Sequence, residues 1–195
     1  IRRQRQMCIR DRNGVGHMQF CGYQWSDGVG YMGPGHNSVL HDKDGSWYLV
    51  YHIRQKSFVG DWLEPSTMQI RKLFWTKDGW PVVSPEPYAG EIEQEIPLEE
   101  IFGKYERINL IKTLPQGIQT AVPMKIERGK WGDYYECCSI QGNWAYENGK
   151  LTITYGPHEE ECFVTAVWDA ERGCPTIGIC GLSGEGIPFV AKKIK

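Results

Sequence analysis

The sequence has no long hydrophobic run, no excess of either charge and no common short catalytic signature. No apolar stretch approaches the roughly 20 residues that a membrane-spanning helix needs, so we expect no membrane partner. The 22 Lys and Arg are balanced by 24 Asp and Glu, which argues against a nucleic-acid partner. The sequence contains no GxSxG, P-loop or HExxH motif and no GxGxxG between a strand and a helix. Function therefore has to be inferred from longer patterns.

Seven cysteines are present, but none forms a CxxC pair or lies beside a histidine at the spacing of a zinc site. We interpret them as free thiols buried in a β core. A Cys162–Cys180 or Cys138–Cys174 disulfide stays open as an alternative.

The composition favours an all-β fold. The chain of 195 residues has 23 Gly and 11 Pro, and 12% of it is aromatic. Many turn formers and many aromatics are typical of short strands joined by tight turns.

Residues 1–12 (IRRQRQMCIRDR) do not fit the rest of the chain. They carry five Arg and one Asp, so the remainder is more acidic than the net charge of −2 suggests. A basic tail is one explanation. The stretch also resembles translated adaptor sequence, and we therefore leave it out of the fold prediction, expecting protein to be missing upstream.

Four antiparallel strands are predicted between residues 33 and 84, at 36–41, 47–54, 68–75 and 80–84. Asp-Gly turns separate the first strand from the second and the third from the fourth. The run WYLVYHIR is typical of a central strand, and Pro81 places the last strand at an edge. This pattern has the size of one β-propeller blade. A single blade would expose apolar side chains meant for its neighbours: Val39, Leu49, Tyr51, Ile70 and Leu73.

The glutamate-rich segment 91–100 is predicted to be a charged linker, so we expect domains at 13–92 and 93–195. Asn148-Gly149 is the strongest hairpin signal in the chain. A small antiparallel barrel is favoured over a sandwich, because a barrel leaves no open edge. The eight strands expected after the linker are 108–113, 120–127, 134–140, 144–147, 151–155, 162–169, 176–180 and 188–192.

The candidate site residue is His36, in the segment Gly-Pro-Gly-His-Asn-Ser at 33–38. Two glycines around a proline predict an irregular entry that aims the imidazole from the first position of a strand. In a propeller that strand lines the central channel, where a histidine can bind a metal or a substrate. A hydrogen-bonded structural histidine is the alternative.

The other histidines are given structural roles. His52 is expected to pack beside Arg54 or a backbone carbonyl, and His17, His41 and His158 to lie on the surface or in loops. No carboxylate stands out as a buried catalytic acid, because the Asp residues of the hairpin turns are turn formers.

The segments GPGHNSVLHDKDGSWYLVYHIR (33–54) and MQIRKLFWTKDGWPVVSPEPYAGE (68–91) resemble the last propeller blade of glycoside hydrolase family 43. Within that family the likeness is to the extracellular endo-α-1,5-L-arabinanases. Residues 97–195, with GNW at 142–144 and AVWD at 166–169, resemble their C-terminal β-barrel. The resemblance implies part of a five-bladed β-propeller followed by a small lipocalin-like barrel.

The resemblance also implies an inverting hydrolase of plant arabinan, secreted and monomeric. Two carboxyl groups about 6.5–9.5 Å apart do this chemistry. In the family they come from earlier blades, so we assign no catalytic residue in this chain. The channel histidine of the family matches His36, which implies a calcium ion held by that imidazole and by water.

Two other functions remain open. The second domain could be a carbohydrate-binding or stabilising module without chemistry of its own. The enzyme could also have another family 43 activity, that of a β-xylosidase or an α-L-arabinofuranosidase.

Overall fold

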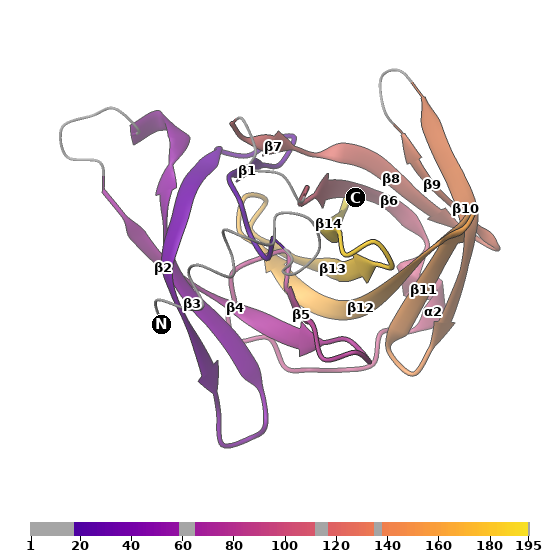
Figure 1. Cartoon of the computed structure of the whole chain (residues 1–195), viewed down its shortest axis with the longest axis horizontal. Coiled ribbons are helices and arrows are strands. Elements are labelled where there is room, and N and C mark those ends of the chain that lie inside the picture. Colours follow the sequence, from indigo (N-terminus) through magenta and orange to yellow (C-terminus); the bar gives the residue numbers. More distant parts are fainter. Residues whose placement is uncertain (1–17, 59–64, 112–116, 135–137, 195) are drawn as a thin grey trace.

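A computed structural model describes residues 18–58, 65–111, 117–134 and 138–194 of the chain. This part is almost entirely β-structure, with a short helix α2 (Leu98–Ile101) and a 3₁₀ turn η1 (Lys56–Phe58). The strands form an open sheet and a closed barrel that lie side by side (Figure 1). The all-β prediction is confirmed.

The open sheet contains the four predicted strands in consecutive antiparallel order. They are β2 (Tyr31–His41), β3 (Trp47–Gln55), β4 (Thr67–Trp75) and β5 (Pro81–Val83). As expected, β3 is an internal strand and β5 is at an edge. The alternation of the sequence and its turn residues were therefore sufficient to predict the blade.

Two further strands enlarge this sheet to six, in the order β5-β4-β3-β2-β1-β7. β1 (Tyr23–Gln24) pairs antiparallel with β2 and parallel with β7 (Gln119–Thr120). The expectation of four strands is corrected here, because two-residue strands carry no readable alternation. β7 comes from the second half of the chain, so the far edge of the blade is built by a distant segment.

The three hairpin turns form as predicted. Gly45 and Gly79 have positive φ angles of 89° and 77°, and their amides bond the carbonyls of Asp42 and Thr76. Asn148 and Gly149 both have positive φ, 52° and 76°, as a type I′ turn requires. These turns can be predicted from the sequence because each needs a residue that tolerates a positive φ angle, which glycine and asparagine do.

The barrel closes from eight antiparallel strands in the order β10-β11-β12-β13-β14-β6-β8-β9. The closed form confirms the barrel over the sandwich. The strands are β6 (Gly103–Asn109), β8 (Val122–Glu127), β9 (Lys130–Tyr134), β10 (Ser139–Glu147), β11 (Lys150–Tyr155), β12 (His158–Asp169), β13 (Cys174–Ser183) and β14 (Pro188–Ile194).

Some of the strands differ from those expected. The first strand, β6, runs over Gly103–Asn109 and so begins earlier than the predicted 108–113. It follows closely on α2, which starts inside the segment predicted to be a linker. Strand β9 lies where a turn was expected, because only Arg128 and Gly129 make the turn. The predicted strand 134–140 is wrong, since Tyr134 ends β9 and Ser139 begins β10.

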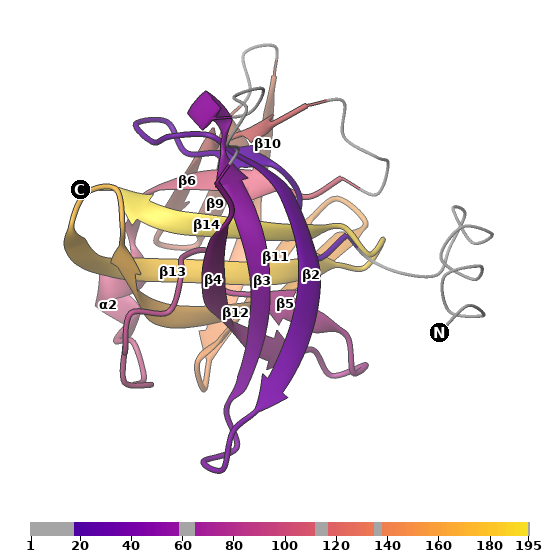
Figure 2. The ribbon, with the colours of Figure 1, turned by 90° about the vertical axis from the view of Figure 1, so that its left-hand side faces the viewer.

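The sheet packs across the outside of the barrel. In Figure 2 strands β2, β3 and β4 cross in front of β13 and β14 at a steep angle. One apolar cluster joins side chains of both, from Leu49, Ile53 and Leu73 of the sheet to Ile108 and Val190 of the barrel. Leu49, Tyr51 and Leu73, which a single blade was expected to expose, are buried in this cluster because the blade here packs against the barrel. Val39 is exposed as expected.

A second apolar cluster fills one end of the barrel interior and includes Tyr105, Met124, Ile153 and Phe189. The inner faces are set by the two-residue period of the strands. The other end of the interior is polar, which positions the second site described below.

Cys21, Cys138, Cys162, Cys174 and Cys180 form no disulfides, so both bridges left open are absent. Cys8 and Cys137 lie outside the described residues. In the part of the chain that the structure describes, no helix is long and apolar enough to cross a membrane.

Candidate functional site

His36 and His52 form a pair on the neighbouring strands β2 and β3. Their Nδ1 atoms are 3.1 Å apart and their ring centroids 4.8 Å apart. His52 lies opposite Gly35 in the ladder, which brings the two rings together. His52 thus contacts His36, whereas the sequence led us to expect Arg54 or a backbone carbonyl beside it. The spacing of the two histidines in the sequence does not predict this contact.

The backbone around His36 is distorted. Gly33 and His36 have positive φ angles of 58° and 47°, and the register of β2 shifts on both sides of Gly35. His36 therefore lies at a bulge inside β2, not at the first position of the strand as expected. A non-glycine residue in the left-handed region is strained, and such strain concentrates at functional positions.

Gly35 also makes room for the pair. A Cβ at this position would come 3.3 Å from Nε2 of His52, tighter than ordinary contact. The close approach explains why glycine precedes His36. The turn-forming residues of the motif thus determine where both imidazoles lie.

A groove of about 400 Å³ opens beside the motif on one face of the sheet. Its wall is mainly apolar and includes Phe20, Pro34, Val39 and Trp75. His36 itself is exposed. Pro34, Gly35 and Asn37 of the motif line this groove, whereas the two imidazoles do not.

Few side chains that could bind a metal lie near the histidine pair. In the part of the chain that the structure describes, no three His, Cys, Asp or Glu side chains cluster in a way that could hold a metal. Asp42 and Asp44 accept hydrogen bonds from the amides of Lys43 and Ser46, which is the role of turn formers. The Ser46 amide lowers the pKa of Asp44. The described residues therefore offer an ion one or two imidazole nitrogens at this place.

The other histidines lie as follows. His41 is exposed and stacks on Trp47, with ring centroids 4.0 Å apart. His158 is half-buried and its Nδ1 is 3.4 Å from a carboxylate oxygen of Glu185. His17 lies outside the described residues.

A buried arginine in the sheet escaped the sequence prediction. Arg71 of β4 is fully buried and donates hydrogen bonds to the hydroxyls of Tyr23 and Tyr51, both at 2.6 Å. It also bonds the carbonyls of Ser84 and Pro85. These hydrogen bonds to uncharged groups make Arg71 a structural tie between β4, β3, β1 and the segment after β5, and Glu86 lies within electrostatic reach of it.

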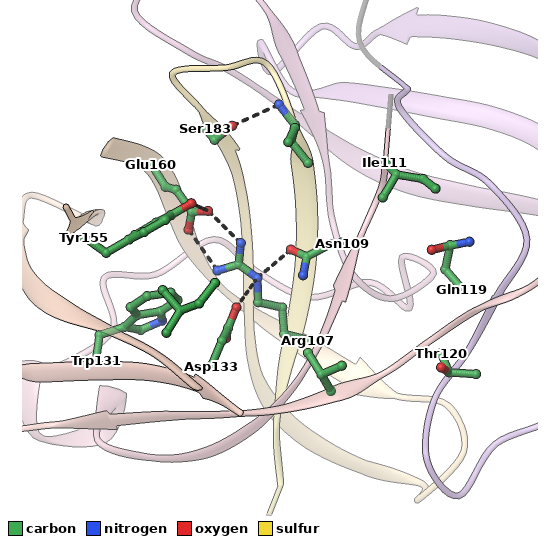
Figure 3. Close-up of a pocket in the computed structure, with 13 residues that line it drawn as sticks. Arg107, Asn109, Ile111, Gln119, Thr120, Trp131, Asp133, Tyr155, Glu160 and Ser183 are labelled. Carbon is green, nitrogen blue, oxygen red and sulfur yellow. Dashed lines mark hydrogen bonds and ion pairs between the residues drawn. The ribbon is translucent and has the colours of Figure 1, made fainter. Parts of the chain in front are cut away.

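A polar cluster also lies inside the barrel, around Arg107 of β6 (Figure 3). Its guanidinium donates two hydrogen bonds to Glu160, at 2.6 and 2.8 Å, and lies 3.2 Å from Asp133. The three side chains come from β6, β9 and β12 and are all buried. Sequence reasoning missed them because they lie far apart in the chain. One signal was available in the sequence: Trp131 and Asp133 are two residues apart, so in a strand their side chains point to the same face.

The chain matches known proteins over most of its length. Residues 85–191 match the C-terminal lipocalin-like domain of glycoside hydrolase family 43. An extracellular endo-α-(1→5)-L-arabinanase of Bacillus subtilis is 32% identical over 165 residues, which cover 82% of this chain and 33% of that protein. One from Thermotoga petrophila is 33% identical over 125 residues, 64% of this chain and 25% of that protein.

Solved structures give the same likeness. The endo-1,5-α-L-arabinanase of Thermotoga petrophila in complex with Tris aligns with a TM-score of 0.80 and 25% identity, covering 93% of this chain and 41% of that one. A family 43 glycoside hydrolase of Bacillus licheniformis aligns with a TM-score of 0.78 and 25% identity, covering 89% and 38%. The chain thus spans a quarter to a third of the length of the curated relatives it matches.

Proposed function

Because this chain belongs to glycoside hydrolase family 43, we propose that it is the C-terminal part of an extracellular endo-α-1,5-L-arabinanase. The observation that carries the proposal is the 32% identity to such an enzyme over 165 residues, which include both the sheet and the barrel. The reaction would be hydrolysis of arabinan with inversion, by two carboxyl groups on opposite sides of the bond. In this proposal both carboxyl groups belong to blades outside this chain.

His36 would serve as a protein ligand of a calcium ion in that enzyme. The strained backbone at His36, the space at Gly35 and the second imidazole at 3.1 Å support a built position. Calcium prefers oxygen ligands, so water would complete its shell and the imidazole would have to be neutral. The ion would supply positive charge near the reacting sugar, while His36 fixes its place relative to β2.

The groove beside His36 would face the neighbouring blade. It leaves Val39 exposed on the same face of the sheet that packs against the barrel, because Val39 pairs with Leu49 and the groove is also lined by Leu49 and Leu73.

A stabilising role for the barrel is a second proposal, carried by the apolar cluster that joins it to the sheet. Ile108 and Val190 of the barrel lie in the same cluster as Leu49 and Leu73 of the blade. The barrel would keep the last blade in place whatever substrate the enzyme cleaves.

A chimera tests the main proposal. Residues 18–195 of this chain replace the matching C-terminal segment of the Bacillus subtilis relative, and hydrolysis of debranched arabinan is measured. We expect the chimera to be active, whereas the truncated relative and this chain alone are inactive, since removal of a general acid or base costs orders of magnitude. His36→Ala should lose activity and bound calcium, and His158→Ala, a change in the barrel, should lose neither.

Other results would reject the proposal. A folded chimera that cleaves aryl β-xylosides or arabinofuranosides but not arabinan would favour the alternative family 43 activities. Arabinan hydrolysis by this chain alone would contradict the absence of catalytic carboxylates. Full calcium content in His36→Ala would remove the role given to His36.

A further inference from the structure

The mouth of the barrel is a cavity of about 370 Å³, at the polar end of the barrel interior (Figure 3). Arg107, Asp133, Glu160 and Tyr155 project into it from four different strands. The apolar cluster of the barrel interior reaches this cavity through Trp131, which lines it. The barrel is thus closed by packed side chains at one end and hollow at the other.

Most of the polar atoms in this cavity already have partners. Glu160 accepts two hydrogen bonds from Arg107 and one from the Tyr155 hydroxyl at 3.1 Å. Arg107 also donates from Nε to Asn109 Oδ1 at 2.8 Å, and its plane lies 3.7 Å from the centre of the Phe189 ring. The guanidinium is therefore held rigidly and does not act as a free anion receptor.

Two buried atoms in the same wall lack partners. Asp133 forms an ion pair with Nε of Arg107 through Oδ2, and its Oδ1 has no hydrogen-bond partner among the described residues. The indole Nε1 of Trp131, two residues earlier on the same face of β9, also has none there. Both side chains are 2% exposed. Buried polar groups are nearly always paired, so an unpaired acceptor and an unpaired donor two residues apart in the wall of one cavity indicate a missing polar group.

A hydroxyl group fits this pair, since it can donate to Asp133 and accept from Trp131 at the same time. An anion is disfavoured because two carboxylates face one guanidinium. A metal ion would find no cluster of three His, Cys, Asp or Glu side chains in the described chain. A purely apolar ligand would leave both atoms unpaired and is excluded on that ground.

The remaining wall suits a sugar. Gln119, Thr120 and Ser183 offer further polar groups, while Ile111, Val122 and Ile187 provide apolar surface for C–H groups. A few convergent polar groups in a mostly apolar hollow are typical of small-molecule sites. We propose that the barrel mouth binds a neutral polyhydroxylated ligand of pentose size, with one hydroxyl between Asp133 and Trp131. This site is distinct from the His36 site and does not depend on the proposed arabinanase activity.

The Trp131 indole N–H signal in a ¹⁵N–¹H NMR spectrum of the full chain tests the proposal. The signal is assigned by its loss in Trp131→Phe. L-Arabinose and α-1,5-arabinotriose are titrated separately, so that a single sugar and a chain end are compared. We expect the signal to shift and to saturate with at least one of the two sugars.

Variants separate the site from general effects. Asp133→Asn should weaken the affinity roughly tenfold or more, because a hydrogen bond to a charged acceptor is lost. Asp78→Asn is the matched control in an exposed turn, where asparagine is equally compatible, and it should bind like the wild type. Ile140→Trp, at the 37% exposed rim, should block binding without touching the buried charges.

Three results would overturn the proposal. The first is no shift of the Trp131 signal with either sugar up to the solubility limit. The second is an equal shift with sodium phosphate or calcium chloride, which would assign the cavity to ions. The third is unchanged affinity in both Asp133→Asn and Ile140→Trp.

Discussion

Lys192 of β14 and Glu86 of the segment that follows β5 form a buried ion pair of 2.9 Å, which joins the barrel to the sheet. The same ammonium lies 2.9 Å from Asp169 and 3.0 Å from Glu171. Lys192 is fully buried and also lies over the ring of Trp25. One cation thus pairs with three carboxylates, one from the segment after β5 and two from the end of β12 and its following turn.

Removing this cation should destabilise the whole chain. Lys192→Met keeps most of the side-chain length but removes the ion-pair partner of buried Glu86 and leaves Asp169 with Arg172 alone. We expect a loss of about 3–5 kcal/mol in the free energy of unfolding, measured by urea denaturation. Lys193→Met, on the neighbouring and more exposed residue, should cost less than about 1 kcal/mol. Equal losses of stability in the two variants would contradict a larger contribution from the buried ion pairs of Lys192.

The pH dependence of stability should depend on Asp133. Burial raises the pKa of this carboxyl to about 6, Arg107 opposes the rise and Glu160 adds to it. Between about pH 4 and pH 6 the folded state therefore holds a proton that the unfolded state has released, so this group makes the fold less stable as the pH rises through that range.

Asp133→Asn removes that effect. Relative to the wild type, the variant should gain about 2–3 kcal/mol of stability between pH 4 and pH 7.5, as measured by urea unfolding at each pH. Asp78→Asn should show no such trend. A constant difference between Asp133→Asn and wild type across this range would mean that the carboxyl titrates normally.

The backbone conformation at His36 predicts that glycine is a more stable replacement there than alanine. Because φ is 47° at this residue, His36→Gly should be about 1 kcal/mol more stable than His36→Ala. Thermal unfolding of the two variants measures the difference. The same pair of changes at Ser38, which has no positive φ, should give the opposite order, since glycine weakens a regular strand. If alanine were as stable as glycine at position 36, the left-handed conformation would be refuted.

The buried thiols should be inert. Burial raises the pKa of Cys21 to about 11 and those of Cys162 and Cys180 well above the usual range. Iodoacetamide at pH 8 should leave these three unmodified in the native protein and modify them in urea, as read by peptide mass spectrometry. Rapid native modification of Cys162 would contradict its place in the barrel core.

The sequence predicted those parts of the fold whose cause is local. The Asp-Gly and Asn-Gly turns, the central strand WYLVYHIR and the edge strand at Pro81 each depend on a few adjacent residues, and all four are confirmed. The likeness carried by residues 33–54 and 68–91 predicted the family. The position of His36 inside a bulge was missed, because a register shift depends on the partner strand.

The barrel mouth was not predictable in the same way. Arg107, Asp133 and Glu160 each look like ordinary surface charges in their own strands. Only closure of the barrel brings them together, and β9, which carries Asp133, was itself mistaken for a turn. Burial of Leu49 and Leu73 was missed for a related reason, since their covering surface is the outside of the barrel.

The parallel pairing of β1 with β7 has a consequence for the order of folding. Tyr23 is synthesised early, but its ladder partner Gln119 emerges from the ribosome only after the first barrel strand. Until then the edge of the nascent blade carries unpaired amides and carbonyls, and its apolar face lacks Ile108 and Val190. Open edges and uncovered apolar surface invite association with other chains. During translation this blade would therefore be a client for chaperones until the end of the chain is released.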